Sequence, residues 1–177
     1  MFVGKNKCEK NMANYKSTTE KGKCVFCEIA KGNFHTPGIF WEDKEFMAFL
    51  SIYPNTEGFT VVIPKKHYSS DVLSLPDKFL EKFILRSKKV SKILLKHYPN
   101  VGRVGLIMEG TGINHAHIKL IPMHDTPYLK GKGKWKQCPS GREDFFKSYP
   151  GYLMSNDGPQ ADLKKIEKLA KELKKKN

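Results

Sequence analysis

Two histidines separated by a single residue carry the strongest chemical signal in this chain of 177 residues. His115 and His117 fall within the mostly apolar run Ile113 to Ile121, which predicts a β-strand. Alternate residues of a strand face the same side, so we expect His115, His117 and Lys119 to project from one face. Two imidazoles, which titrate near neutral pH, and an ammonium make this face a candidate site. A half-exposed strand whose polar face only meets water would explain the same pattern.

The second signal is the Cys-x-x-Cys pair formed by Cys24 and Cys27. The first residues lack the continuous apolar region of a secretory leader, so we expect an intracellular chain. In such a chain the pair is typical of half a metal site or of a redox dithiol. The chain has four cysteines, too few and too unevenly spaced for a disulfide framework. Cys8 and Cys138 have no evident partner, and we assign them no role.

A short glycine-rich stretch lies just before the two histidines. It contains Gly110, Thr111 and Gly112 and follows Glu109. Glycine lets backbone amides approach an anion closely, so this loop is a candidate phosphate-binding element. Glycines at a plain hairpin turn explain the stretch equally well.

The elements that must position these groups alternate between strands and one long helix. Apolar residues at helical spacing predict a main helix that follows Ser74 and Pro76 and runs to about His97. A second amphipathic helix is predicted from Leu163 to Leu173. Short aromatic and β-branched runs predict a hairpin and further strands, at residues 39–43, 46–52, 59–63, 104–108 and 113–121.

Length and charge divide the chain into a folded body with extensions at both ends. We expect a basic flexible arm at 1–23, one domain at 24–127 and an extension at 128–177 that ends in the second helix. The apolar runs are far shorter than the roughly 20 residues of a membrane helix. Most of the net charge of +14 falls in the two ends. Solubilising tails are favoured over a nucleic-acid surface, because basic residues of such a surface usually gather on a recognition element.

Three motifs in order resemble the histidine triad (HIT) superfamily. They are the Cys24 to Cys27 segment, the segment from Val62 to His67, and the His-x-His run that ends in Ile121 and Pro122. The resemblance implies an α+β fold with a five-stranded antiparallel sheet and a long helix, commonly as a homodimer. Most members are nucleotide hydrolases or nucleotidyl transferases, so we expect an enzyme of that class.

The resemblance also assigns roles around the triad. His117 matches the nucleophile that attacks the α-phosphorus of a bound nucleotide and forms a nucleotidyl-histidine intermediate. Lys119 stands where the family has its third histidine, and we place it among the catalytic residues. The unperturbed pKa of Lys is about 10.4, so Lys119 is a poorer proton shuttle near pH 7 than imidazole. The amides of the Gly110 to Gly112 loop are expected to receive charge that develops on the phosphate.

A structural zinc site is implied by the zinc-containing branch of the same family. The matching ligands are Cys24, Cys27, His67 and His115. Two thiolates and two imidazoles suit tetrahedral zinc and leave no open position, so the metal would be structural. A reduced, metal-free thiol pair with unrelated histidines is the alternative.

The resemblance places the nucleotide against further side chains. Phe26, Ile29 and Ile52 match the base pocket, although apolar residues of this kind could equally belong to the core. Ser51 stands where many members have an aspartate that holds the ribose hydroxyls.

We therefore expect a cytoplasmic, homodimeric, zinc-containing hydrolase or nucleotidyl transferase. Its substrate would be a nucleotide adduct, such as a dinucleoside polyphosphate or a nucleoside phosphoramidate. One alternative is a nucleotide-binding module with little turnover. Another is an enzyme that processes nucleic-acid 5'-adenylates with help from the basic ends; nucleic acid is possible as a partner but not favoured.

Overall fold

The computed structural model describes residues 18, 22–36 and 38–126, which all lie in the first compact unit of the chain, Met1–Trp135. The helix predicted from Leu163 to Leu173, the extension that contains it and most of the basic arm lie outside the described residues. Among the described residues, no helix combines the length and the apolar character needed to cross a membrane.

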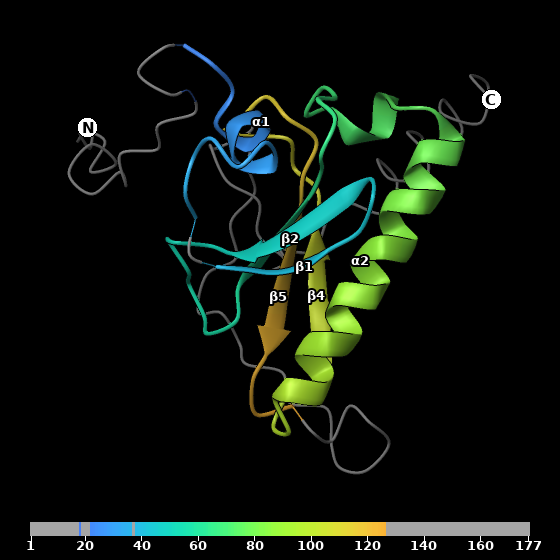
Figure 1. Ribbon diagram of the computed structural model, residues 1–177. Coiled ribbons are helices and arrows are strands. Elements are labelled where there is room, and N and C mark those ends of the chain that lie inside the picture. The colour runs from blue at the N-terminus through green and yellow to red at the C-terminus, as the bar shows by residue number, and fades with distance from the viewer. Residues whose placement is uncertain (1–17, 19–21, 37, 127–177) are drawn as a thin grey trace, which may run out of the picture. The chain divides into compact units, whose positions relative to one another are not determined.

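One five-stranded sheet forms the centre of the described fold (Figure 1). Its order is β1-β2-β3-β5-β4, and all neighbouring strands are antiparallel. The strands are β1 (Ile39–Glu42), β2 (Phe46–Leu50), β3 (Thr60–Pro64), β4 (Arg103–Ile107) and β5 (Ile118–Met123). The α+β class, the five antiparallel strands and the long helix expected from the sequence are confirmed.

The two faces of the sheet carry separate apolar clusters. Alternation along β2 sends Phe46 and Ala48 into one cluster and Met47 and Phe49 into the other. The first cluster packs against α2 (Asp77–His97), which runs along the sheet in Figure 1. The second cluster packs against the short helix α1 (Val25–Ala30). Side chains that alternate on one strand therefore point either to the long helix or to α1.

The main helix α2 begins and ends where the sequence predicts. Pro76 is its N-cap, and the residue before Pro99, Tyr98, leaves helical geometry with φ −102° and ψ 99°. Phe83, Val90 and Leu94 form its buried stripe against the sheet. Lys96 and His97 in the last turn complement the negative end of the helix dipole.

Two short elements have no counterpart among the predicted ones. They are α1, with six residues, and a 3-10 turn at Val72–Ser74. Six residues contain too few turns for a helical period to stand out in a sequence. Helix α1 is stabilised instead by tertiary packing, because Val25, Phe26 and Ile29 are buried against the sheet.

The strand predicted for 113–121 begins later than expected. Strand β5 starts at Ile118, so His115 and His117 lie in the irregular segment before it. In that segment the backbone N–H of His115 donates to the carbonyl of Ile113 at 2.7 Å, and that of Ala116 donates to Tyr68 at 2.9 Å. These bonds replace the sheet ladder, and they fold the backbone so that both imidazoles become buried.

Candidate functional site

His117 is held in one tautomer by the backbone. Its Nδ1–H donates to the carbonyl oxygen of His115 over 2.8 Å, because a carbonyl can only accept. The Nε2 atom is therefore the unprotonated nitrogen of the neutral ring. The side chain is 4% exposed, and burial lowers the pKa of His117 below the usual value for histidine. The result is a neutral imidazole with a free lone pair on Nε2.

His115 is held in the opposite tautomer. Its Nε2–H donates to the carbonyl oxygen of Pro64 at 2.9 Å, so its Nδ1 carries the lone pair. Burial is the main cause that lowers the pKa of His115 to about 4. The free Nδ1 lies 3.5 Å from Sγ of Cys24 and 3.4 Å from Sγ of Cys27. A neutral His115 therefore presents its lone pair to two thiols.

Four potential metal ligands come together at this point. They come from three places in the chain: Cys24 and Cys27 lie at the start of α1, His67 follows β3, and His115 precedes β5. Their ligand atoms all lie within 4.8 Å of one another. Nδ1 of His67 lies 3.3 Å from Sγ of Cys27. This is the set that the sequence proposed, and the structure shows that it could hold a metal ion.

The donor chemistry of this cluster fits a cation. The hydrogen bond from His115 to Pro64 is the kind of backbone contact that orients a metal-bound imidazole. Burial, followed by the neighbouring Cys24 thiol, raises the pKa of Cys27 to about 11. Without a cation the Cys27 thiol thus keeps its proton, and a bound metal would displace that proton from sulfur.

Helix α1 connects the cluster to His117. The ring of Phe26 lies 5.8 Å from that of His115 and 5.7 Å from that of His117, in edge-on contacts. The two histidines therefore face the same side of the sheet, toward α1, although they precede the strand on which they were expected. Phe26 lies between Cys24 and Cys27 in the sequence, so the segment that supplies the two thiols also supplies the ring that packs on His117.

Lys119 shares this face and forms an ion pair. Its cross-strand partner on β3 is Val61, which belongs to the cluster under α1. The ammonium pairs with the carboxylate of Glu109, and the hydroxyl of Thr111 donates to the same carboxylate at 3.3 Å. Burial lowers the pKa of Lys119 below the usual value for lysine. Lys119 therefore has a carboxylate partner inside the site, which the residue pattern did not predict.

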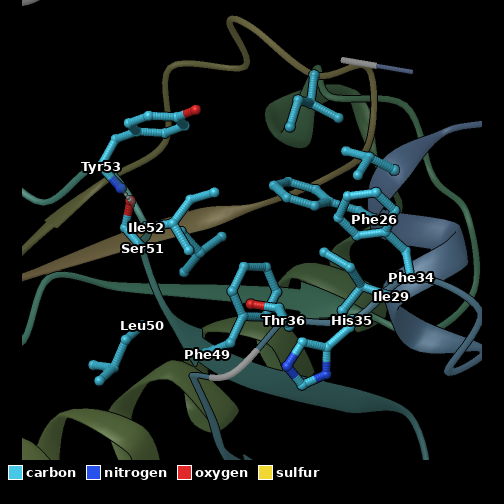
Figure 2. A pocket seen from close by; sticks show the side chains of 13 residues that line it. Phe26, Ile29, Phe34, His35, Thr36, Phe49, Leu50, Ser51, Ile52 and Tyr53 are labelled. Atoms are coloured by element: carbon cyan, nitrogen blue, oxygen red, sulfur yellow. Dashed lines mark hydrogen bonds between the residues drawn. The ribbon is translucent and has the colours of Figure 1, made fainter. Parts of the chain in front are cut away.

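A cavity of about 540 Å³ opens between α1 and the end of β2 (Figure 2). Figure 2 shows Phe26 and Ile29 on one side of it, with Ser51 and Ile52 facing them from the other. The remaining lining residues are Val25, Phe34, His35, Thr36, Phe49, Leu50, Tyr53, Val61 and Ile113. Its walls are mostly aliphatic and aromatic, which suits a flat ring system with a few polar groups.

Ser51 has a defined hydrogen-bonding role in the cavity wall. Its hydroxyl oxygen accepts from the backbone N–H of Tyr53 at 3.1 Å. The hydroxyl hydrogen remains available to donate to a ligand. Ser51 is thus arranged as a donor, whereas an aspartate would only accept.

The residues predicted for the substrate fall into two groups. Phe26, Ile29, Ser51 and Ile52 all line the cavity. Gly110, Thr111 and Gly112 are not among the residues that line it, although Ile113 is. Gly110 is required by geometry, because φ is +68° and a Cβ would lie 2.6 Å from the carbonyl oxygen of Ser70. The loop is therefore packed tightly onto the segment after His67.

A sequence profile of the HIT domain matches residues 36–126, slightly more than half of the chain. The chain belongs to the HIT family. An uncharacterised HIT-like protein of Methanocaldococcus jannaschii is 36% identical over 106 residues, covering 58% of this chain and 80% of the relative. The adenosine 5'-monophosphoramidase of Schizosaccharomyces pombe is 30% identical over 121 residues, covering 68% of this chain and 89% of the yeast protein.

A solved structure supports the fold of this HIT protein. A protein of Streptococcus mutans superposes with a TM-score of 0.59 at 22% identity, covering 91% of this chain and 88% of that chain. At this identity the comparison concerns the fold alone.

Two features of this HIT protein were missed from the sequence. Glu109 stands next to the predicted loop, but its pairing with Lys119 depends on how β4 and β5 are aligned. Phe34, His35 and Thr36 follow α1, and no periodic pattern marks them as cavity residues. Both features depend on how the fold brings separate segments of the chain together.

Proposed function

We propose that this HIT protein is a hydrolase or nucleotidyl transferase that acts on the α-phosphate of a nucleotide adduct. The observation that carries the proposal is the tautomer of His117. A buried, neutral imidazole has its Nδ1–H bound to the backbone and its Nε2 lone pair free. A free Nε2 can attack phosphorus without first losing a proton. Phe26 packs against this ring and also lines the cavity, so a bound nucleotide would lie beside it.

The proposed reaction has two steps. In the first, Nε2 of His117 attacks the α-phosphorus, and the bond from phosphorus to the leaving group breaks with its electron pair on that group. When the leaving atom is nitrogen, the Lys119 ammonium donates the proton that the departing amine takes. In the second, water attacks the phosphorus, His117 is released, and the proton of the water goes to the neutral Lys119 amine. The products are the amine and the nucleoside 5'-monophosphate, and both side chains return to their starting states.

Nucleoside phosphoramidates are the favoured substrate class within this proposal. The yeast relative named above is an adenosine 5'-monophosphoramidase. Burial lowers the pKa of Lys119, which makes proton donation to a leaving amine easier than it is for an exposed lysine. The apolar cavity with Phe26 and Ile52 on opposite walls would hold the base, and the Ser51 hydroxyl would donate to the sugar.

A structural zinc ion belongs to the proposal. Zinc bonds of about 2.3 Å to sulfur and 2.0 Å to nitrogen at tetrahedral angles separate the two ligands by about 3.5 Å. The three sulfur to Nδ1 distances in the cluster are 3.5, 3.4 and 3.3 Å. Zinc would be held by all four residues, leaving no position for substrate, and would tie α1 to the segment that carries His117. A homodimer and a cytoplasmic location complete the proposal.

Intact-mass measurement after a short incubation tests the function. Purified protein is incubated with adenosine 5'-phosphoramidate, with diadenosine tetraphosphate and with their guanosine counterparts, and is quenched early. We expect a mass gain of one nucleotide on the parent and none on His117→Ala. The matched control is His97→Ala, an exposed histidine at the end of α2, which should behave like the parent.

Two results would count against the proposal. An adduct of equal size on His117→Ala would place the nucleophile elsewhere. Absence of both adduct and released nucleotide over hours would favour a nucleotide-binding module with little turnover.

A further inference from the structure

Glu109 follows β4 and reaches the proposed catalytic residue Lys119. Lys119 faces Ile107 on β4, and Glu109 follows Ile107 by two residues. Lys119 lies across from Val61 on the face of the sheet that carries α1, and its ion pair brings the Glu109 carboxylate to that face. The carboxylate therefore lies next to the ammonium that is proposed to protonate the leaving group.

The carboxylate is fixed in this place. It pairs with the Lys119 ammonium and accepts from the hydroxyl of Thr111 at 3.3 Å. The Glu109 side chain is 13% exposed and that of Lys119 is 24% exposed, so water screens the two charges only in part. The pair has no net charge, which means that Lys119 is not a free cation for binding a polyphosphate.

Building on the proposed function, we propose that Glu109 is a specificity-determining residue. Its carboxylate selects adducts whose leaving group is an amine over those whose leaving group is a phosphate.

The selection follows from the charge and hydrogen-bonding capacity of the two kinds of leaving group. A carboxylate only accepts hydrogen bonds, and a departing amine offers N–H donors. A departing polyphosphate is an anion with acceptors alone, so it meets like charge and has no donor to offer Glu109. Lys119 can still give its proton to the amine. The lysine is then neutral, and the Glu109 carboxylate can accept a hydrogen bond from an N–H of the departing amine.

The test compares two substrates on the full chain. Values of kcat/KM are measured for adenosine 5'-phosphoramidate and for diadenosine tetraphosphate with the parent, Glu109→Gln and the control Glu81→Gln. Glutamine keeps the size of the side chain and can still accept from Thr111. We expect the parent to favour the phosphoramidate, and Glu109→Gln to narrow the ratio by about tenfold or more, since one like-charge contact is removed. Glu81 is exposed on α2, and its variant should leave the ratio unchanged.

A second pair of variants covers a failure of Glu109→Gln to fold. Removing one member of a partly buried ion pair leaves the other unpaired, which can destabilise the protein. The double variant Glu109→Gln with Lys119→Gln removes both charges and is compared with Lys119→Gln alone. The preference for the phosphoramidate, measured as the ratio of the two kcat/KM values, should be smaller in the double variant than in Lys119→Gln.

The outcomes separate this inference from the proposed function. If Glu109→Gln changes both kcat/KM values by the same factor, Glu109 only supports the loop and the inference is wrong. If the parent cleaves both substrates and the ratio narrows as expected, the inference is supported. If the parent cleaves neither substrate, the proposed function itself has failed, and the inference fails with it.

Discussion

At the scale of single residues, the two histidines of one short motif are prepared for different tasks. His115 donates from Nε2 to Pro64 and presents Nδ1 to the thiols, whereas His117 donates from Nδ1 to His115 and presents Nε2. Two backbone carbonyls thus set which nitrogen of each ring keeps its lone pair. One ring suits metal binding, and the other suits attack on phosphorus.

The proposed metal site predicts the effect of removing one thiol. Cys27→Ser should reduce the zinc content from roughly one ion per chain to near zero, since a hydroxyl is a weak substitute for a thiolate in a four-ligand site. Zinc is measured by mass spectrometry on protein purified without added chelator. Cys8→Ser, at a cysteine outside the described residues, is the control and should keep its metal. Full zinc content in Cys27→Ser would contradict the proposed ligand set.

Removal of the metal should also reduce stability. The proposed zinc ion would bind the folded cluster and not the unfolded chain, so a chelator should lower the unfolding temperature of the parent. Without chelator, Cys27→Ser should have a lower unfolding temperature than the parent. Chelator should change the unfolding temperature of this variant only a little. Differential scanning calorimetry measures both, and an equal shift in parent and variant would argue against a metal in this cluster.

At the scale of elements, the turn between β1 and β2 is anchored to the long helix through one carboxylate. Oδ1 of Asp43 accepts from the backbone N–H groups of Glu45 and Phe46, both at 2.8 Å, and Nε of Arg86 on α2 donates to Oδ2 at 2.5 Å. The turn connects β1 to β2, and the end of β2 leads into the cavity wall at Ser51. This contact therefore positions one side of the cavity.

Substitution of Asp43 should destabilise the fold. We expect Asp43→Ala to lower the free energy of unfolding by about 1–3 kcal/mol, because two turn bonds and one charged bond are lost. Asp43→Asn should lose less, since its amide oxygen still accepts from the turn. Urea unfolding at pH 7 measures the changes. Glu45→Gln is the control: its ion pair with Lys82 is about half exposed and should contribute little.

The contribution of Asp43 should also depend on pH. Burial raises the pKa of Asp43, but the bonds from Glu45, Phe46 and Arg86 outweigh it and hold the pKa below the ordinary 3.8. The stabilisation is thus fully present above 3.8 and is lost as the pH falls through the lower, folded-state value. In urea titrations, the difference in the free energy of unfolding between the parent and Asp43→Asn should therefore narrow as the pH falls below 3.8. A constant difference would show that the charge of Asp43 has no part in it.

At the scale of the whole molecule, β4 forms one edge of the sheet, and exposed apolar side chains lie on β4 and on α2. Leu106 on β4 is 42% exposed, and Leu85 and Ile93 on α2 are 53% and 40% exposed. An edge strand has unpaired backbone groups that can continue a sheet into a second copy. These features support the proposed homodimer.

A charge on this edge should separate the dimer. We expect light scattering to give about twice the chain mass of 20.3 kDa for the parent and a value near one chain for Leu106→Lys. Leu73→Lys, at an exposed leucine outside the sheet, is the control and should remain dimeric. A dimeric Leu106→Lys would place the interface elsewhere.

Local pattern was enough to predict the hairpin and the long helix, and the resemblance to the HIT superfamily supplied the class of fold. Alternation and helical spacing depend on neighbours in the chain, so β2 and α2 could be predicted from the printed sequence. The four potential metal ligands were also predicted from the sequence, because the order of its three motifs resembles the HIT superfamily. Geometry had no part in that prediction. The helix α1 and the start of β5 could not be predicted in this way, because tertiary packing and long-range backbone bonds decide them.

The sequence by itself determined which chemical groups this protein has; the tertiary structure decided what each group meets. His115 and His117 are the same residue type, and only the carbonyls of Pro64 and His115 give them opposite tautomers. Lys119 appears in the sequence as an isolated cation, and only the register of β4 against β5 gives it Glu109 as a partner. The physical reason is that hydrogen bonds, ion pairs and burial depend on distances in space, which separation along the chain does not specify.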